Sequence, residues 1–266
     1  RENFGIPKES CMLCATHTHS GPNTAGESGW GDIDQKYCDD VFIPAILKAI
    51  EKAIAAAHNA GGGRVIIPSG EWISGAFKMK SNVALFVSDN AVLRFPDDPL
   101  IIYRAPLRSN GRPTMTMRAL IQASSCTNVA VMGKGTLKAD VDYWHRNFML
   151  NPQRGFPRPQ LFNFSRCKNV RFEGFKIRGS PAWTMHFLLC DDVIIRNVDS
   201  SCSGPNTDGI DLESCNGALV EGCSLDQTDD TYTIKSGFNE CMKNFWEHRY
   251  EYDGVYYLQA MPVKEI

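Results

Sequence analysis

Short stretches of apolar or alternating residues recur along the middle of the chain, and each follows a small cluster of turn residues. Four of them read VAVMG, VRFEGFKI, VIIRNV and ALVEGCSL, and each begins three residues after a cysteine: Cys126, Cys167, Cys190 and Cys215. The Asn, Asp and Gly residues in between form turns that tolerate unusual backbone angles. The pattern predicts short β-strands separated by tight turns.

The spacing of these strands indicates a coil that repeats. Successive cysteines are 41, 23 and 25 residues apart, and Ser81–Leu85 is an earlier, looser copy. With a period near 20, the first step spans two turns of a solenoid whose rungs stack at about 4.8 Å. A β-sandwich also has short strands, but it does not explain the cysteine column. We expect the cysteines to be free thiols that stack as small buried hydrophobes.

One amphipathic helix precedes the strands. Apolar residues occur at helical spacing between residues 39 and 59: Ile43, Ile46, Leu47, Ile50 and Ile54. Asp39 or Asp40 is expected to cap its start, and Gly61–Gly63 to end it. Two stretches without strand alternation, 97–117 and 142–159, are predicted to be long loops. Such loops on one face of a solenoid usually form its binding surface.

Composition excludes several classes of function. The net charge is −2 and 43% of the residues are hydrophobic, which is enough to fill a core. Acids and bases are interspersed, so we expect neither a nucleic-acid nor a membrane partner. No apolar run approaches the roughly 20 residues of a membrane helix.

Three carboxylates mark the candidate site. Asp208 precedes the adjacent pair Asp229 and Asp230 by 21 residues, about one turn of the predicted coil. Three acids on one wall repel one another, which favours a functional role over that of solvated turn residues. Two carboxyl groups about 6.5–9.5 Å apart, with a water between them, suit inverting glycoside hydrolysis.

The same residues carry a resemblance to a known family. The chain is similar to glycoside hydrolase family 28, the polygalacturonases and their relatives, from about residue 54 to residue 237. The matching strings are Asn206-Thr207-Asp208-Gly209, Gln227-Thr228-Asp229-Asp230, Ile234-Lys235-Ser236-Gly237, Ala60–Pro68, Gly133-Lys134-Gly135-Thr136 and Ser180–His186.

The resemblance implies a fold, a reaction and a substrate. The fold is a right-handed parallel β-helix whose first coil is covered by a helix. Asp229 is the general acid, while Asp208 and Asp230 position and activate water. Lys235 and Asn206 bind substrate, and His186 borders the cleft with Trp183, although packed structural roles stay open for both. The substrate is pectic or another acidic polysaccharide, no cofactor is needed, and secretion or periplasmic export is implied.

Two further observations concern substrate binding and whether the chain can catalyse the reaction. Arg154 and Arg158 lie in the second predicted loop and suit bidentate binding of a uronate carboxylate, with solvated loop charges as the alternative. The family's Gly-His-Gly and Arg-Ile-Lys strings do not occur after Gly237. We therefore expect a β-helix truncated at its C-terminal end, and a non-catalytic glycan-binding β-helix stays open as the second hypothesis.

The beginning of the chain differs from the rest. Its string Ala15-Thr16-His17-Thr18-His19-Ser20-Gly21-Pro22 resembles the neutral ceramidase family. That resemblance implies a zinc ligand at His17 or His19 and gives a remote third hypothesis, a zinc-dependent amidase. The predicted division is a ceramidase-like fragment over residues 1–53, the β-helix over 54–237, and an unassigned tail over 238–266.

Overall fold

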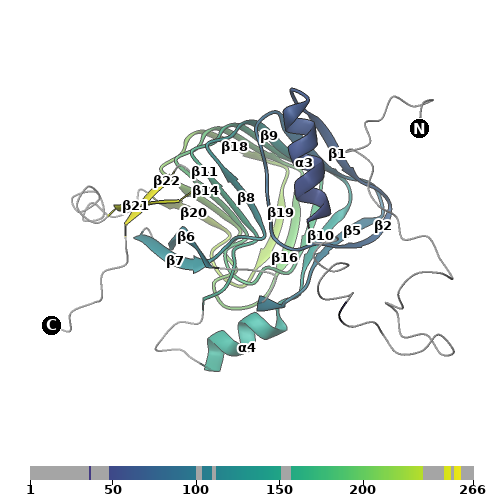
Figure 1. The fold of residues 1–266 in the computed structure, drawn as a ribbon. Coiled ribbons are helices and arrows are strands. Elements are labelled where there is room, and N and C mark those ends of the chain that lie inside the picture. Colours follow the sequence, from purple (N-terminus) through teal and green to yellow (C-terminus); the bar gives the residue numbers. More distant parts are fainter. Residues whose placement is uncertain are drawn as a thin grey trace, which may run out of the picture.

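The computed structural model describes Lys36 and residues 48–99, 104–109, 112–150, 157–235, 249–252 and 255–258. Within these residues the chain winds into a solenoid with three parallel sheets of six strands each (Figure 1). Within these three sheets, consecutive strands along the chain lie in different sheets, and each strand pairs with its counterpart in the neighbouring coil. The right-handed parallel β-helix predicted from the sequence is confirmed.

Each sheet takes one strand from each coil. Sheet A consists of β1 (Gly63–Ile67), β4 (Val83–Val87), β9 (Thr127–Gly133), β12 (Lys168–Glu173), β15 (Asp191–Arg196) and β18 (Asn216–Glu221). Sheet B consists of β2 (Gly70–Ile73), β5 (Ala91–Phe95), β10 (Thr136–Ala139), β13 (Lys176–Arg178), β16 (Asp199–Cys202) and β19 (Ser224–Gln227). Sheet C consists of β3 (Phe77–Lys78), β8 (Ile121–Ser124), β11 (Phe162–Ser165), β14 (Met185–Leu188), β17 (Ile210–Glu213) and β20 (Tyr232–Lys235).

The coil between β9 and β12 is longer than the sequence pattern indicated. Strands β9 and β12 pair directly, so the 41 residues between Cys126 and Cys167 form one coil, and the expectation of two turns is wrong. Helix α4 (Asp142–Leu150) accounts for much of the extra length, in a stretch predicted to be a loop. The other predicted loop contains a hairpin of β6 (Arg104–Ser109) and β7 (Arg112–Met117).

Helix α3 (Ala49–Asn59) lies across the first coil, as Figure 1 shows. Ile50 and Ile54 are buried against the core, and His58 Nδ1 lies 2.9 Å from the carbonyl oxygen of Ser81. The predicted helix therefore exists and covers the coil. Its expected beginning and its Asp39 or Asp40 cap lie outside the described residues.

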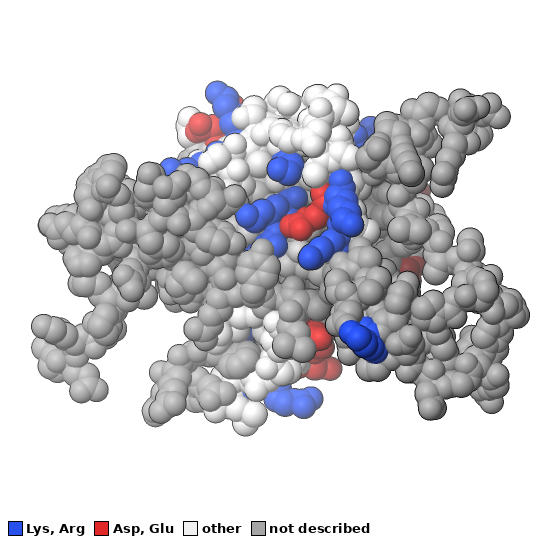
Figure 2. Space-filling model, in the orientation of Figure 1, with Lys and Arg blue, Asp and Glu red and all other residues white. Residues whose placement is uncertain are grey.

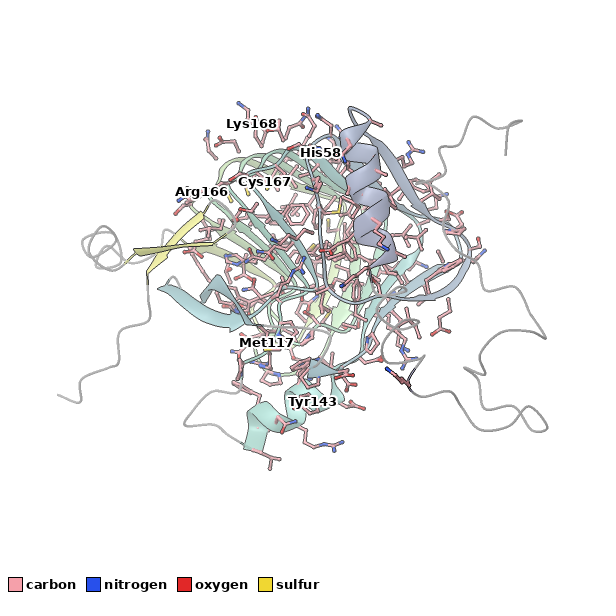
Figure 3. The ribbon with its side chains drawn as sticks, viewed as in Figure 1. His58, Met117, Tyr143, Arg166, Cys167 and Lys168 are labelled. Atoms are coloured by element: carbon pink, nitrogen blue, oxygen red, sulfur yellow. The ribbon has the colours of Figure 1, made fainter. Side chains whose placement is uncertain are left out.

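The core is filled from all three sheets. Five phenylalanine rings pack together in the middle of the solenoid: Phe162, Phe164, Phe172, Phe175 and Phe187. The predicted cysteine column also forms, with Cys126, Cys167 and Cys190 buried, Cys215 half-buried and all four thiols free. Figure 3 labels Cys167 between Arg166 and Lys168, which are both exposed.

An asparagine ladder runs along the turns that lead into sheet A. The Asn169 amide donates to Asn128 Oδ1, and the Asn128 amide donates to Asn82 Oδ1. All three residues have a positive φ, between 55° and 62°. Asn tolerates this left-handed conformation better than most residues, which explains its recurrence before these strands.

A second hairpin, β21 (Arg249–Tyr252) and β22 (Val255–Leu258), contacts β7 through β22.

On the described part of the face shown in Figure 2, basic and acidic side chains lie side by side. Among the described residues, no helix has the length and hydropathy needed to cross a bilayer.

Candidate active site

The three predicted acids lie together at the start of two neighbouring strands of sheet C. Asp208 precedes β17, and Asp229 and Asp230 precede β20. Ile210 pairs with Tyr232, which places Asp208 beside Asp230 on adjacent rungs. One oxygen from each of the three carboxylates lies within 4.8 Å of one from each of the others. The spacing of 21 residues thus corresponds to one coil.

The backbone holds the two rungs close together at this point. The Gly209 amide donates to the carbonyl oxygen of Asp230, 2.8 Å away. A Cβ atom at Gly209 would lie 2.5 Å from the carbonyl oxygen of Thr231. Glycine after Asp208 is therefore required by the close approach of the next rung, which explains the Asp-Gly pair in the sequence.

Asp208 is the most buried of the three acids. Its side chain is 8% exposed, whereas Asp229 and Asp230 are exposed. Burial and, to a lesser extent, the negative charge of Asp211 raise the pKa of the Asp208 carboxyl, Lys235 opposes them, and the net result is a pKa of about 6. At pH values below about 6, Asp208 therefore holds a proton.

Asp229 is oriented by the backbone. Its Oδ2 accepts a hydrogen bond of 3.1 Å from the amide of Asn206 on the previous rung. Its Oδ1 accepts one of 2.9 Å from the amide of Asp230. Hydrogen bonds to both oxygens fix the carboxylate while leaving it exposed to solvent.

Lys235 lies at the centre of the charge arrangement. Its Nζ is 2.6 Å from Asp211 Oδ1, 3.8 Å from Asp208 Oδ2 and 3.7 Å from the centre of the Trp183 ring. The amine thus offsets the negative charge of the acids and stacks on an aromatic face, which favours a cation at this place.

Asp211 was missed by the sequence reasoning. It is fully buried, and its Oδ1 accepts hydrogen bonds from Lys235 Nζ and the Thr233 hydroxyl. Its Oδ2 has no hydrogen-bond partner. The signal was present in the strand Ile210–Glu213, because alternation places Asp211 and Glu213 on the same face.

His186 is buried with no exposed surface. Its Nε2 lies 3.1 Å from Glu213 Oε2 and its Nδ1 lies 3.0 Å from the Asn163 amide nitrogen. The Trp183 ring covers it edge-on, with 5.0 Å between ring centres. This position favours the packed role that the sequence left open, and a direct substrate contact of His186 stays a prediction.

Arg158 joins three segments next to the site. Its Nη1 donates to the carbonyl oxygens of Pro181 and Pro205, and its Nη2 donates to Asn206 Oδ1 at 2.6 Å. The guanidinium also stacks on the Phe148 ring of α4, and burial lowers its pKa to about 10. Its donors are thus engaged within the chain. Arg154, the other predicted arginine, lies outside the described residues.

One group of side chains could hold a metal ion. In the described part of the chain, the trio of Asp208, Asp229 and Asp230 is the one group that brings three such side chains together. His17 and His19, the weak candidates from the sequence, lie outside the described residues.

Comparisons with known proteins agree with this geometry. The family model described as glycosyl hydrolases family 28 matches residues 79–246, well over half of the chain. The solved structure of a hyperthermoactive exopolygalacturonase from Thermotoga maritima is similar with a TM-score of 0.64 and 33% identity, over 71% of this chain and 50% of that one.

Curated sequences show the same likeness. A probable polygalacturonase from Vitis vinifera is 27% identical over 204 residues, which is 73% of this chain and 41% of the relative. A probable exopolygalacturonase B from Emericella nidulans is 29% identical over 131 residues, 45% of this chain and 30% of the relative. The chain therefore spans less than half the length of these two curated relatives.

Proposed function

The chain belongs to glycosyl hydrolases family 28, and from this membership we propose that its site hydrolyses galacturonate-containing pectic polysaccharide. The observation that carries the proposal is the position of three carboxylates on neighbouring rungs, with oxygens within 4.8 Å of one another. A glycosidic bond needs one group that protonates the leaving oxygen and another that activates water. The relatives named above are polygalacturonases or exopolygalacturonases, which is consistent with a pectic substrate.

The proposed roles are those that the resemblance to family 28 implies. Asp229 is the general acid, and its exposure leaves it accessible to the leaving oxygen of a substrate. Asp208 and Asp230 flank the position of the attacking water. Because the pKa of Asp208 is about 6, this residue accepts a proton from water only once it is ionised, above that pH.

Lys235 supplies the positive charge that a uronate substrate requires. Its side chain is 27% exposed, and its amine lies 3.8 Å from Asp208 Oδ2. A substrate carboxylate binding here replaces part of the interaction with Asp211, so substrate and Asp211 share one cation. Asn206, exposed next to Asp229, is the second proposed substrate contact.

Inversion at the anomeric carbon is the proposed stereochemical outcome. This outcome rests on the resemblance to family 28, because the nearest carboxyl oxygens, within 4.8 Å of one another, are closer than the about 6.5–9.5 Å expected of inverting enzymes. Inversion here requires the water to bind among three acids instead of between two. Proton NMR of the first product distinguishes the outcomes, because inversion releases the anomer opposite to that of the cleaved bond. Release of the same anomer would overturn this part of the proposal.

A non-catalytic β-helix that binds acidic glycans is the second candidate. The strings Gly-His-Gly and Arg-Ile-Lys do not occur among residues 238–266. A zinc-dependent amidase using His17 or His19 rests on the resemblance of residues 1–53 to neutral ceramidases alone.

Reducing-end release from polygalacturonate separates the first two candidates. The proposal expects release by the unaltered chain and at least a hundredfold less by Asp229→Asn. Equal release by both, or none by either, contradicts it. In the latter case, binding of polygalacturonate by both proteins would support the glycan-binding candidate. A molar equivalent of bound zinc would instead support the amidase.

A further inference from the structure

The turns that lead from sheet B into sheet C are joined to one another by the side chain of Arg158. Its Nη1 donates to the carbonyl oxygens of Pro181, before β14, and Pro205, before β17. Its Nη2 donates to the side-chain oxygen of Asn206, 2.6 Å away. Because Arg158 itself precedes β11, one guanidinium connects the turns of three successive coils.

The last of these turns contacts the proposed general acid. The Asn206 amide donates to Asp229 Oδ2 on the next coil, 3.1 Å away. Asn206 has a φ of 55°, in the left-handed region that few residues other than glycine adopt. The direction of its amide depends on this backbone conformation, which the hydrogen bond from Arg158 to the Asn206 side chain helps to fix. Gly204 and Thr228 join the same two turns at a second point, with 2.8 Å between the Gly204 amide and the Thr228 hydroxyl. Loss of Arg158 should therefore redirect Asn206 without detaching the whole turn.

Helix α4 covers the other side of the guanidinium. The Arg158 Cζ lies 3.7 Å from the centre of the Phe148 ring. His145, about one helical turn earlier, has its Nε2 3.1 Å from the carbonyl oxygen of Ser180. The same imidazole lies so close to Gly204 that a Cβ atom there would be 2.2 Å from it. Helix α4 thus packs on the turns that Arg158 joins.

These contacts favour a role of Arg158 within the chain over the bidentate uronate binding expected from the sequence. Arg158 is only 8% exposed, and three acceptors of the chain occupy its two terminal nitrogens. A uronate carboxylate that took both nitrogens would have to displace Asn206. The hydrogen bond that Asn206 gives to Asp229 would then lose its support.

The guanidinium also carries a charge close to the acids. Burial lowers the pKa of Arg158 to about 10, and the negative charge of Asp208 opposes this shift. Arg158 is therefore positively charged at neutral pH and can act through its charge as well as through its hydrogen bonds. A lysine keeps the charge but lacks the planar fork of donors, so substitution by lysine separates the two contributions.

We propose that Arg158 is a positioning residue, which α4 holds in place and which directs the Asn206 amide toward Asp229. The inference rests on the proposed function and adds a residue to the same site. Arg158 does not touch the substrate, because it acts on the turn whose amide orients the general acid. A misdirected Asp229 still lets the substrate bind but protonates the leaving oxygen poorly. Loss of Arg158 should therefore lower kcat and leave KM nearly unchanged.

Kinetics on polygalacturonate distinguish positioning from substrate binding. Arg158→Met removes the donors and the charge, and we expect it to lower kcat by about tenfold or more while KM changes less than about threefold. Arg158→Lys should recover little of this loss. Arg171→Met, at an exposed position on β12 of sheet A, is the matched control and should leave both constants unchanged. A raised KM with an unchanged kcat, or full recovery in Arg158→Lys, overturns the inference.

A spectroscopic measurement tests the inference without turnover. In the unaltered chain, the NMR shift of the Asn206 amide proton should follow the titration of Asp229, and Asp229→Asn should abolish this response. Arg158→Met is expected to lose at least half of the response, and an undiminished response contradicts the inference. If the unaltered chain releases no reducing ends, the proposed function fails, and the Asn206 response alone decides whether Arg158 positions Asp229.

A second variant covers the case in which Arg158→Met does not fold, which thermal unfolding detects. Phe148→Leu removes the aromatic face from the guanidinium but keeps Arg158. It should lower kcat several-fold and reduce the Asn206 response, again with little change in KM. An unchanged kcat together with an unchanged Asn206 response in Phe148→Leu would show that α4 does not hold Arg158 in place for this role.

Discussion

Asp208 illustrates how a functional residue opposes stability. Its pKa is raised from its ordinary value to about 6, so the folded chain favours the protonated carboxyl. Between the ordinary pKa near 4 and about pH 6, the folded state binds more protons than the unfolded state. The free energy of unfolding therefore falls as the pH rises through this range, and the penalty is complete above it.

Substitution of Asp208 by Asn should remove that penalty. At pH 7.5 we expect the free energy of unfolding to rise by about 1–3 kcal/mol, with little change at pH 4. The same variant should lose activity by about 10²–10⁴-fold. Thermal unfolding at the two pH values measures the first effect. Stabilisation that is equal at both values would show that charge burial is not its cause.

Asp211 is expected to position Lys235 and to set the pKa of Asp208. Asp211→Asn removes a buried negative charge beside Asp208 and weakens the hold on Lys235. The acidic limb of the pH profile of kcat/KM should therefore move to lower pH, and KM should increase. Asp226→Asn, on β19, is the matched control and should change neither. A purely structural role of Asp211 would lower activity without shifting the profile.

At the scale of single elements, the turns into sheet A depend on the asparagine ladder. Asn128→Ala removes two ladder hydrogen bonds and places alanine at a φ of 55°. A loss of about 2–3 kcal/mol in unfolding free energy is expected from the two effects together. Asn128→Gly removes the same hydrogen bonds without the backbone strain. It should lose about 1 kcal/mol less, and equal losses in denaturant titrations would contradict this explanation.

Helix α3 should stabilise the solenoid through its buried face. Ile54 is fully buried against the first coil, so Ile54→Ala is expected to cost about 2–5 kcal/mol. Lys52→Ala, on the same helix but exposed, should change the unfolding free energy by less than about 0.5 kcal/mol. Chemical denaturation of both variants measures the difference. A small effect of Ile54→Ala would mean that the helix is not needed to cover the coil.

Sequence patterns predicted those features that repeat. The cysteine column and the one-coil offset between Asp208 and Asp229 follow from regular stacking, so both were visible in the spacing. The 41-residue step between Cys126 and Cys167 was wrongly interpreted as two turns, because an insertion containing α4 lengthens one coil without adding a rung. Asp211 was missed because its role depends on contacts between coils, which periodicity does not reveal.

At the scale of the whole molecule, the coil brings together groups that are distant in sequence. Asp208 precedes β17, and Asp229 precedes β20 on the next rung. Lys235 ends β20, and Trp183 precedes β14, one rung before β17. Arg158 links this arrangement to α4 through Phe148 and Asn206. Precise stacking of the rungs is therefore part of the function, because a shift of one rung would separate the acids.

The most direct test is the non-additivity of two substitutions. Asp208→Asn, Asp229→Asn and the double variant are compared by kcat/KM on polygalacturonate, with thermal unfolding as the check on folding. If the two acids act on one reacting centre, the double variant should be no slower than the slower single variant, within about tenfold. Losses that multiply, or single variants as active as the unaltered chain, would show that these neighbouring rungs do not form one catalytic site.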